Sequence, residues 1–134
     1  MNPQAVIQQV TALATKDDSI AALWLYGSRT KGTAGPDSDY DLAVKYYDYL
    51  KDPLKNRLRP ELLAMDWHDV LGREPGVELS VVDIELVPTP LAAAIIDHGI
   101  LLMDKAPLET AWLYQKIWSK WDDWKYHRSA NMAG

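Results

Sequence analysis

The chain has 134 residues and a mass of 15.1 kDa, enough for one compact domain spanning 1–134 with a real hydrophobic core. Its 48% hydrophobic and 25% charged residues are typical of a globular protein. The absence of cysteine excludes disulfides, a thiol nucleophile and a Cys-based zinc site. A net charge of −5 argues against a protein that coats nucleic acid. No apolar run reaches the ~20 residues of a membrane span and no secretory signal is recognisable, so we expect a soluble cytoplasmic protein.

Hydrophobic spacing and turn residues divide the chain into alternating helices and strands. Apolar residues at three- and four-residue intervals predict helices at 3–16, 53–71 (broken or restarted at Pro60), 91–98 and 107–128. Short apolar or alternating runs predict strands at 20–26, 40–46, 77–86 and 100–103. The glycine-rich segment 27–38 predicts a loop or a short helical turn. This order predicts an α/β (α+β) fold, with one mixed sheet and helices packed mainly on one face.

The segment with the clearest chemical pattern joins the first two predicted strands. Asp39 and Asp41 stand two residues apart at the start of a strand, so both carboxylates project from one face of the sheet. Like charges on one face repel unless a cation lies between them, and oxygen ligands without nearby His or Cys favour Mg²⁺ or Mn²⁺. Upstream, Gly27 and Ser28 follow a buried strand directly, where glycine permits close approach and free N–H groups can bind an anion. Together, the two features indicate a nucleoside triphosphate with magnesium.

Neither feature is specific alone, because a Gly-Ser turn and an Asp-x-Asp at a strand edge both occur by chance on solvated surfaces. Their combination is more informative: Gly27-Ser28 is separated by ten residues from Asp39-Tyr40-Asp41, on consecutive predicted strands. This spacing resembles the signature of the DNA polymerase beta-like nucleotidyltransferase superfamily. In length and in the residues of this motif, the chain is similar to the minimal nucleotidyltransferase (MNT) antitoxins of the MntA type, which are paired with HEPN-domain toxins. The motif covers about 15 residues, and the order of elements matches along most of the chain.

The resemblance implies a minimal nucleotidyltransferase fold and a third carboxylate on a later strand. Asp83 and Glu85 are the candidates, and we expect Asp83, because alternation places it with Leu79 and Val81, where an unpaired carboxylate would be costly without a metal. The resemblance further implies that the metal ligands Asp39, Asp41 and Asp83 are also the catalytic residues and hold two Mg²⁺ ions. It implies that the ATP phosphates are bound by Gly27, Ser28, Arg29 and Lys31. Lys31 stands where many relatives have Arg, and it lacks the bidentate fork of that side chain.

The implied activity is transfer of AMP from ATP to a tyrosine hydroxyl of a cognate HEPN ribonuclease toxin, which silences the toxin. Two alternatives remain open. The chain could be a non-catalytic antitoxin that neutralises its toxin by stoichiometric binding, or it could be an adenylyltransferase that acts on a small antibiotic. The antibiotic enzymes usually carry a further helical domain, for which this chain has no length.

The last predicted helix, 107–128, carries four of the six tryptophans: Trp112, Trp118, Trp121 and Trp124. Core packing accounts for part of this pattern, because one face of the helix must be buried. The tryptophans spread beyond a single stripe, which favours an additional role of this helix in docking a partner.

Overall fold

The computed structural model describes residues 2–35, 38–72 and 76–133, so Pro36 and Asp37 of the glycine-rich loop lie outside the described residues. Its strands are β1 (Ile20–Tyr26), β2 (Tyr40–Tyr46), β3 (Leu79–Asp83) and β4 (Ile100–Asp104). Its helices are α1 (Pro3–Lys16), α2 (Ser28–Lys31), α3 (Pro53–Val70), α4 (Thr89–His98) and α5 (Pro107–Ala133). The predicted elements are therefore confirmed in type and order, with the loop of residues 27–38 containing the short helix α2.

The strands form one mixed sheet in the order β3-β2-β1-β4. Strand β1 is antiparallel to both β2 and β4, whereas β2 and β3 are parallel. The register places Asp41 beside Tyr26 of β1 and beside Ser80 of β3. Because residues paired across a sheet project from the same face, these three side chains share one face.

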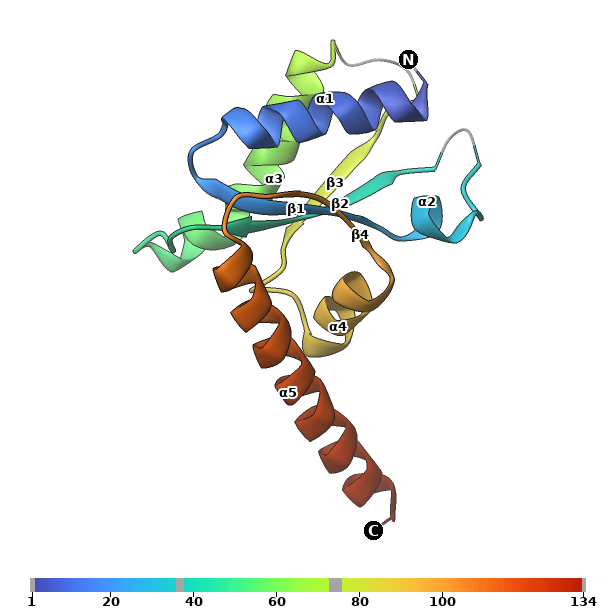
Figure 1. Ribbon diagram of the computed structural model, residues 1–134, viewed down its shortest axis with the longest axis vertical. Helices are drawn as coiled ribbons and strands as arrows, with labels where there is room; N and C mark the ends of the chain where they lie inside the picture. The colour runs from blue at the N-terminus through green and yellow to red at the C-terminus, as the bar shows by residue number, and fades with distance from the viewer. Residues whose placement is uncertain (1, 36–37, 73–75, 134) are drawn as a thin grey trace.

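Helices cover both faces of this sheet, which differs from the expectation that they pack mainly on one (Figure 1). Helices α1 and α3 cover a first face, where Leu42 and Val44 of β2 are fully buried. Helices α4 and α5 cover a second face, where Ala43 of β2 is buried. The reason is visible in β1, whose residues are apolar without interruption: a strand buried on both faces needs no polar alternation.

Two element boundaries differ from the sequence prediction for local reasons. Helix α3 is continuous through Pro60, which is buried among the residues that face the sheet. Strand β3 ends at Asp83 instead of continuing to Leu86, because the Asp83 carboxylate accepts a hydrogen bond from the Glu85 N–H (2.9 Å) and the chain turns there.

Helix α5 is longer than predicted, and its C-terminal half extends beyond the rest of the molecule (Figure 1). Its first half packs on the second face of the sheet through Leu113 and Ile117, and the Tyr114 hydroxyl accepts a hydrogen bond from the Trp24 indole (2.8 Å). Among the described residues, no helix is long and apolar enough to cross a membrane.

Candidate active site

Gly27 ends β1 in a backbone conformation that only glycine adopts easily, with φ at +79°. A Cβ atom at this position would overlap with Oδ2 of Asp41. Glycine is therefore required twice here, for the turn itself and for the close approach of the Asp41 carboxylate. The geometry brings the Gly-Ser turn and the second acid of the Asp-x-Asp pair into direct contact.

Asp39 and Asp41 lie at the start of β2, as predicted. Asp39 is exposed, while Asp41 is partly buried on the second face of the sheet. Burial and, to a lesser degree, the negative charge of Asp39 raise the pKa of the Asp41 carboxyl above its ordinary value. Within the described part of the chain, no hydrogen-bond donor or cation contacts either carboxylate. The two acids thus form an uncompensated pair of negative charges.

Tyr26 is a neighbour of this pair that the sequence reading did not single out. It lies directly opposite Asp41 in the antiparallel register of β1 and β2. Partial burial and the charge of Asp41 both raise the pKa of its hydroxyl. Its position at the end of β1, immediately before Gly27, was the available signal, because the end of one strand pairs with the start of the next in an antiparallel hairpin.

The short helix α2 starts at the turn and carries Ser28 and Lys31. The Thr30 hydroxyl donates a hydrogen bond to the Gly27 carbonyl (2.8 Å), which fixes the first turn of the helix. Ser28 is partly buried at the start of α2, and Lys31 is exposed at its other end. The roles of Gly27, Ser28 and Lys31 toward phosphates stay predictions.

Arg29 has a different set of contacts from the one expected of a phosphate ligand. Its guanidinium donates a hydrogen bond to the Ser38 carbonyl (2.6 Å) and lies 3.8 Å from the centroid of the Tyr40 ring. Tyr40 is buried in the first-face core, on the side of the sheet opposite Asp41. Arg29 therefore holds the two residues that flank Asp39, and it links α2 to the start of β2.

The structure does not bring Asp83 to the acid pair, so the geometry gives no support to its predicted role as the third metal ligand. In the parallel register of β2 and β3, Asp41 lies beside Ser80, whereas Asp83 lies beside Val44. Three residues of strand separate these positions, about 10 Å. An odd number of residues also turns the side chain to the opposite face of the sheet.

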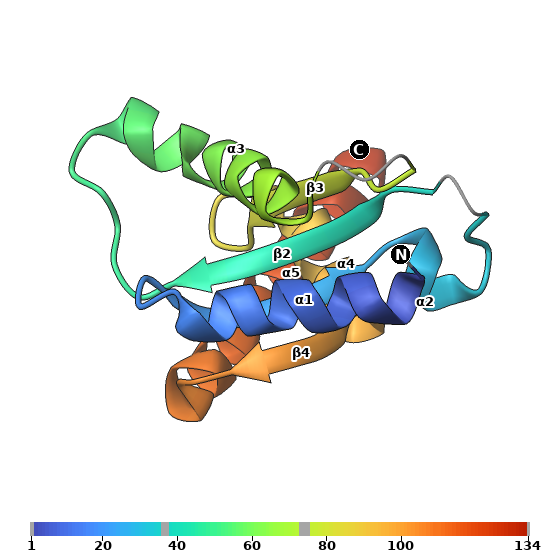
Figure 2. The ribbon, with the colours of Figure 1, turned by 90° about the horizontal axis from the view of Figure 1, so that it is seen from above.

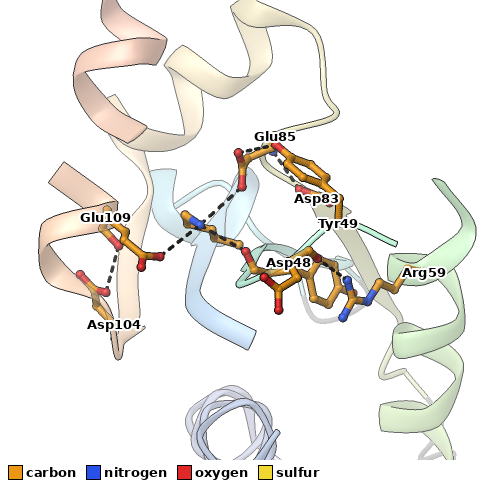
Figure 3. A network of polar contacts seen from close by, with 10 residues as sticks. Asp48, Tyr49, Arg59, Asp83, Glu85, Asp104 and Glu109 are labelled. Atoms are coloured by element: carbon orange, nitrogen blue, oxygen red, sulfur yellow. Dashed lines mark hydrogen bonds and ion pairs between the residues drawn. The ribbon is translucent and has the colours of Figure 1, made fainter. Parts of the chain in front are cut away.

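The surroundings of Asp83 explain how a buried carboxylate is tolerated there without a metal. Its side chain accepts the Glu85 N–H bond, and the positive charges of Arg59 and Lys45 partly offset the burial that raises its pKa. Nearby, the Lys45 amine forms ion pairs with Glu85 (3.5 Å) and with Glu109 of α5 (3.8 Å). Figure 3 shows this network, in which Glu85 contacts Asp83 and the Lys45 amine links Glu85 to Glu109.

Tyr49 completes this network from the segment that follows β2. Its hydroxyl donates a hydrogen bond to Glu85 (2.7 Å), an interaction that together with burial raises the pKa of the hydroxyl to about 12. The acids at this end of the sheet thus have protein partners, and the network is structural.

Glu78 is the acidic residue whose backbone lies beside the start of β2. Its carbonyl accepts the Tyr40 N–H bond (2.8 Å), so it directly precedes the paired segment of β3. Its side chain is exposed, and its carboxylate lies 4.0 Å from the His68 imidazole of α3. The structure therefore places a third acid near the pair in backbone register, with its side chain directed toward α3.

The donor set fits a magnesium ion that is shared with a phosphate ligand. Among the described residues, no group of three His, Cys, Asp or Glu side chains is arranged to hold a metal. Mg²⁺ is, however, commonly held by one or two carboxylates together with the oxygens of a substrate phosphate. Asp39 and Asp41 supply such a carboxylate pair, and their mutual repulsion provides the charge that a cation would neutralise.

A strand that ends in Gly-Ser, antiparallel to a strand that starts with two acids, is the arrangement of a nucleotidyl-transfer site. The chain belongs to the family described as polymerase beta, nucleotidyltransferase, which matches residues 8–108. The fold is accordingly a minimal nucleotidyltransferase fold.

Several solved structures share this fold over almost the whole chain. One is a toxin–antitoxin complex with AMP-PNP (22% identity, 99% of this chain and 97% of that chain covered, TM-score 0.71). Another is a tri-AMPylated Shewanella oneidensis HEPN toxin in complex with MNT antitoxin (19% identity, 97% and 95% covered, TM-score 0.70). A third is a mutant MntA toxin–antitoxin complex (20% identity, 99% and 97% covered, TM-score 0.71). At these identities the likeness establishes the fold, and no curated protein matches the chain in sequence.

Proposed function

We propose that this protein transfers AMP from ATP to a hydroxyl group of a HEPN toxin partner and thereby silences it. The observation that carries the proposal is the uncompensated pair Asp39 and Asp41 in contact with the Gly27 turn. Buried or repelling charges without partners destabilise a fold, so such a pair is typical of a site that binds a cation and an anionic substrate.

The chemistry follows from the residues that surround the pair. Asp39 and Asp41 would hold magnesium, which supplies charge neutralisation on the phosphates and activation of the acceptor hydroxyl. Ser28 and the N–H groups that follow Gly27 would bind the phosphate chain, and exposed Lys31 would contribute positive charge to the leaving group. The acceptor oxygen forms a bond to the α-phosphorus, the bond to the β-phosphate oxygen breaks, pyrophosphate leaves and the hydroxyl proton passes to solvent. Arg29 keeps Asp39 in place through Ser38 and Tyr40.

We assign the third acid of the site to Glu78 in place of Asp83. Glu78 stands at the start of β3, and in a parallel pair the start of one strand lies beside the start of the other. Its exposed carboxylate makes one long contact, to His68, and a change of side-chain rotamer on a long, flexible glutamate requires little energy. A Glu78→Gln variant is expected to lose transfer activity without losing stability.

The proposed partner class comes from the solved structures of similar fold, which are complexes of antitoxins with toxins. We place the partner contact on α5, whose C-terminal half projects from the molecule (Figure 1). In the first half of α5, Trp112 is 64% exposed and Trp118 is 37% exposed. Trp121 instead packs partly against the second-face core and stacks on Trp124, with ring centroids 5.1 Å apart.

The decisive experiment separates catalysis from sequestration. Wild-type protein at a small fraction of the toxin concentration, with ATP and magnesium, should leave the repurified toxin heavier by AMP and inactive as a ribonuclease. An enzyme acts below stoichiometry and leaves a covalent product, whereas a binding antitoxin does neither. Neutralisation that requires equal amounts of both proteins, with no mass change on the toxin, would establish sequestration in place of transfer.

The partner surface can be tested separately with Trp112→Ala. The control is Leu86→Ala, at an apolar residue outside α5 that is 46% exposed. Truncating a central interface tryptophan commonly costs over ~2 kcal/mol, about 30-fold in the dissociation constant. We expect Trp112→Ala to weaken toxin binding by this amount while the circular dichroism and melting temperature stay unchanged. Unchanged toxin binding by Trp112→Ala and Trp118→Ala would remove α5 from the interface.

A further inference from the structure

Helix α3 carries an exposed apolar stripe along its outer side. Leu54, Leu58, Leu62 and Met65 recur at intervals of four, four and three residues, so they lie on one face of the helix. Their side chains are 63%, 39%, 57% and 60% exposed. Contiguous exposed apolar surface of this kind is uncommon on monomeric proteins and marks contact sites.

The stripe is additional to the face that α3 uses for folding. The residues buried against the sheet, such as Pro60 and Trp67, lie on the opposite side of the helix. Leu50 precedes the helix and joins Leu58 and Leu62 in lining a pocket of about 420 Å³ beside the stripe. Figure 2 shows α3 along the edge of the molecule next to β3, where its outer side faces away from the sheet. The helix is therefore apolar on two faces and covered on one.

The order of residues along the stripe is symmetric to within one residue about its centre, near position 60. In an antiparallel arrangement of two identical helices about this centre, Leu58 of one helix lies opposite Leu62 of the other. Leu54 of one helix lies opposite Met65 of the other in the same register. A surface that matches its own copy in this way is what a two-fold interface requires.

The charges beside the stripe have the same symmetry. The first half of α3 contains Lys55 and Arg57, and the second half contains Glu61 and Asp66. In the antiparallel register, Lys55 of one copy lies opposite Asp66 of the other on one flank, and Arg57 lies opposite Glu61 on the other flank. Each flank would thus carry two pairs of opposite charges, and the two-fold axis relates the two pairs of a flank to each other.

We propose that two copies of this protein associate in solution through antiparallel packing of their α3 helices. The occupant of the stripe is a second copy because a single antiparallel arrangement brings the leucines and both sets of charges opposite one another to within about one helical turn. A different partner has no reason to show this match. An 18-residue helix is about 27 Å long, so the contact is at the small end of specific interfaces and gives a concentration-dependent dimer. Helices α3 and α5 cover opposite faces of the sheet, so the dimer leaves α5 free.

The test uses the purified chain without toxin or nucleotide, followed by sedimentation velocity from low to high micromolar concentration. Wild type should shift from monomer to dimer as the concentration rises. Leu62→Glu should weaken dimerisation at least ~10-fold, because it places a charge at the centre of the contact. Leu108→Glu, at a leucine of α5 that is 67% exposed, is the matched control and should dimerise like wild type.

A charge exchange keeps the test independent of any packing defect. Lys55→Glu alone and Asp66→Lys alone should each dimerise about tenfold more weakly, since each converts two attractions into repulsions. An equimolar mixture of the two variants should form a heterodimer, and the Lys55→Glu/Asp66→Lys double variant should recover the wild-type affinity. Wild type that remains monomeric at every concentration overturns the proposal, as does a Leu62→Glu variant that loses toxin binding instead of self-association.

Discussion

The two ends of strand β2 show two ways in which this protein treats acidic side chains. At the start of the strand, the negative charges of Asp39 and Asp41 repel each other, and the Asp41 carboxylate contacts the Gly27 turn. No positively charged group of the described residues binds either carboxylate. At its end, Lys45 is buried between Glu85 and Glu109, and Asp83 accepts a main-chain hydrogen bond. Both ends contain partly buried carboxylates with raised pKa values, so the pKa alone does not distinguish them.

The difference lies in what compensates the charge. A carboxylate whose burial is offset by an N–H group and nearby cations is already satisfied by the fold, and it needs no ligand. A carboxylate pair whose repulsion is not compensated by other groups of the protein is stabilised only when a cation, together with its anionic ligand, binds there. We therefore interpret the start of β2 as a functional site and its end as a structural network. The substitutions below test this difference.

The largest effect is expected from Asp39→Asn combined with Asp41→Asn. Loss of the magnesium ligands should reduce AMP transfer by roughly a thousandfold or more, because metal stabilisation of phosphoryl transfer is worth several kcal/mol. The fold should remain intact, since neither carboxylate makes a hydrogen bond or an ion pair within the described residues. Toxin labelling with radioactive ATP measures the loss, and circular dichroism reports the fold. Full activity in the double variant would show that the start of β2 is not the site.

Most of this fold could be predicted from sequence periodicity. The apolar run of β1 and the alternation of β2 set the strands, and Asn2 and Asp52 cap α1 and α3 by accepting main-chain N–H bonds. The layering could not be predicted, because a helix such as α3 that is apolar on two sides does not show which side meets the sheet. The continuity through Pro60 depended on tertiary packing, which overrides the local preference.

The site could be predicted from the sequence only where its geometry depends on residues that are close together in the chain. Gly27 and the Asp39–Asp41 pair follow from a turn and a two-residue alternation, and both lie where the sequence indicated. The third acid depends on how β3 pairs with β2, which sequence alternation does not reveal. The alternation of Asp83 with Leu79 and Val81 was interpreted correctly as one face, but the parallel register puts that face on the other side of the sheet from Asp41.

Arg29 should produce the second-largest effect, and its kinetics separate two roles. A positioning residue that holds Ser38 and Tyr40 predicts a fall in kcat of about 10- to 100-fold in Arg29→Met, with the KM for ATP nearly unchanged. A phosphate ligand predicts the reverse, a raised KM, which is the result expected for Lys31→Met. Arg29→Lys should recover part of kcat, because an ammonium retains the attraction to the Tyr40 ring but loses the planar fork.

Asp83→Asn tests the structural end of the strand directly. Asparagine retains an oxygen that accepts the Glu85 N–H bond, so the turn after β3 should form as before. We expect AMP transfer within about threefold of wild type and a change in unfolding free energy of at most about 1 kcal/mol. Chemical denaturation and the toxin-labelling assay measure the two quantities. Loss of transfer with unchanged magnesium-ATP binding would return Asp83 to the catalytic site.

The smallest effect concerns stability as a function of pH in the metal-free protein. Folding raises the pKa of Asp41, so its contribution to stability is present at low pH and is lost as the pH rises through the folded-state pKa. Asp41→Asn has no charge to lose, so it should be more stable than wild type near neutral pH. The advantage should stay below about 1 kcal/mol, because the carboxyl is partly exposed and solvent screens it. It should disappear as the pH falls below the ordinary aspartate value.

Magnesium with a non-hydrolysable ATP analogue should reverse this order. Ligands that bind only the folded state add stability, and wild type retains both carboxylates of the proposed site while Asp41→Asn does not. Melting temperatures at neutral pH, with and without both ligands, are the measurement. Asp83→Asn alters an acid of β3 that lies beside the other end of β2. It is the matched control and should gain as much from the ligands as wild type. A larger ligand-induced rise in melting temperature in Asp41→Asn than in wild type would mean that the carboxylate pair at the start of β2 does not bind a cation.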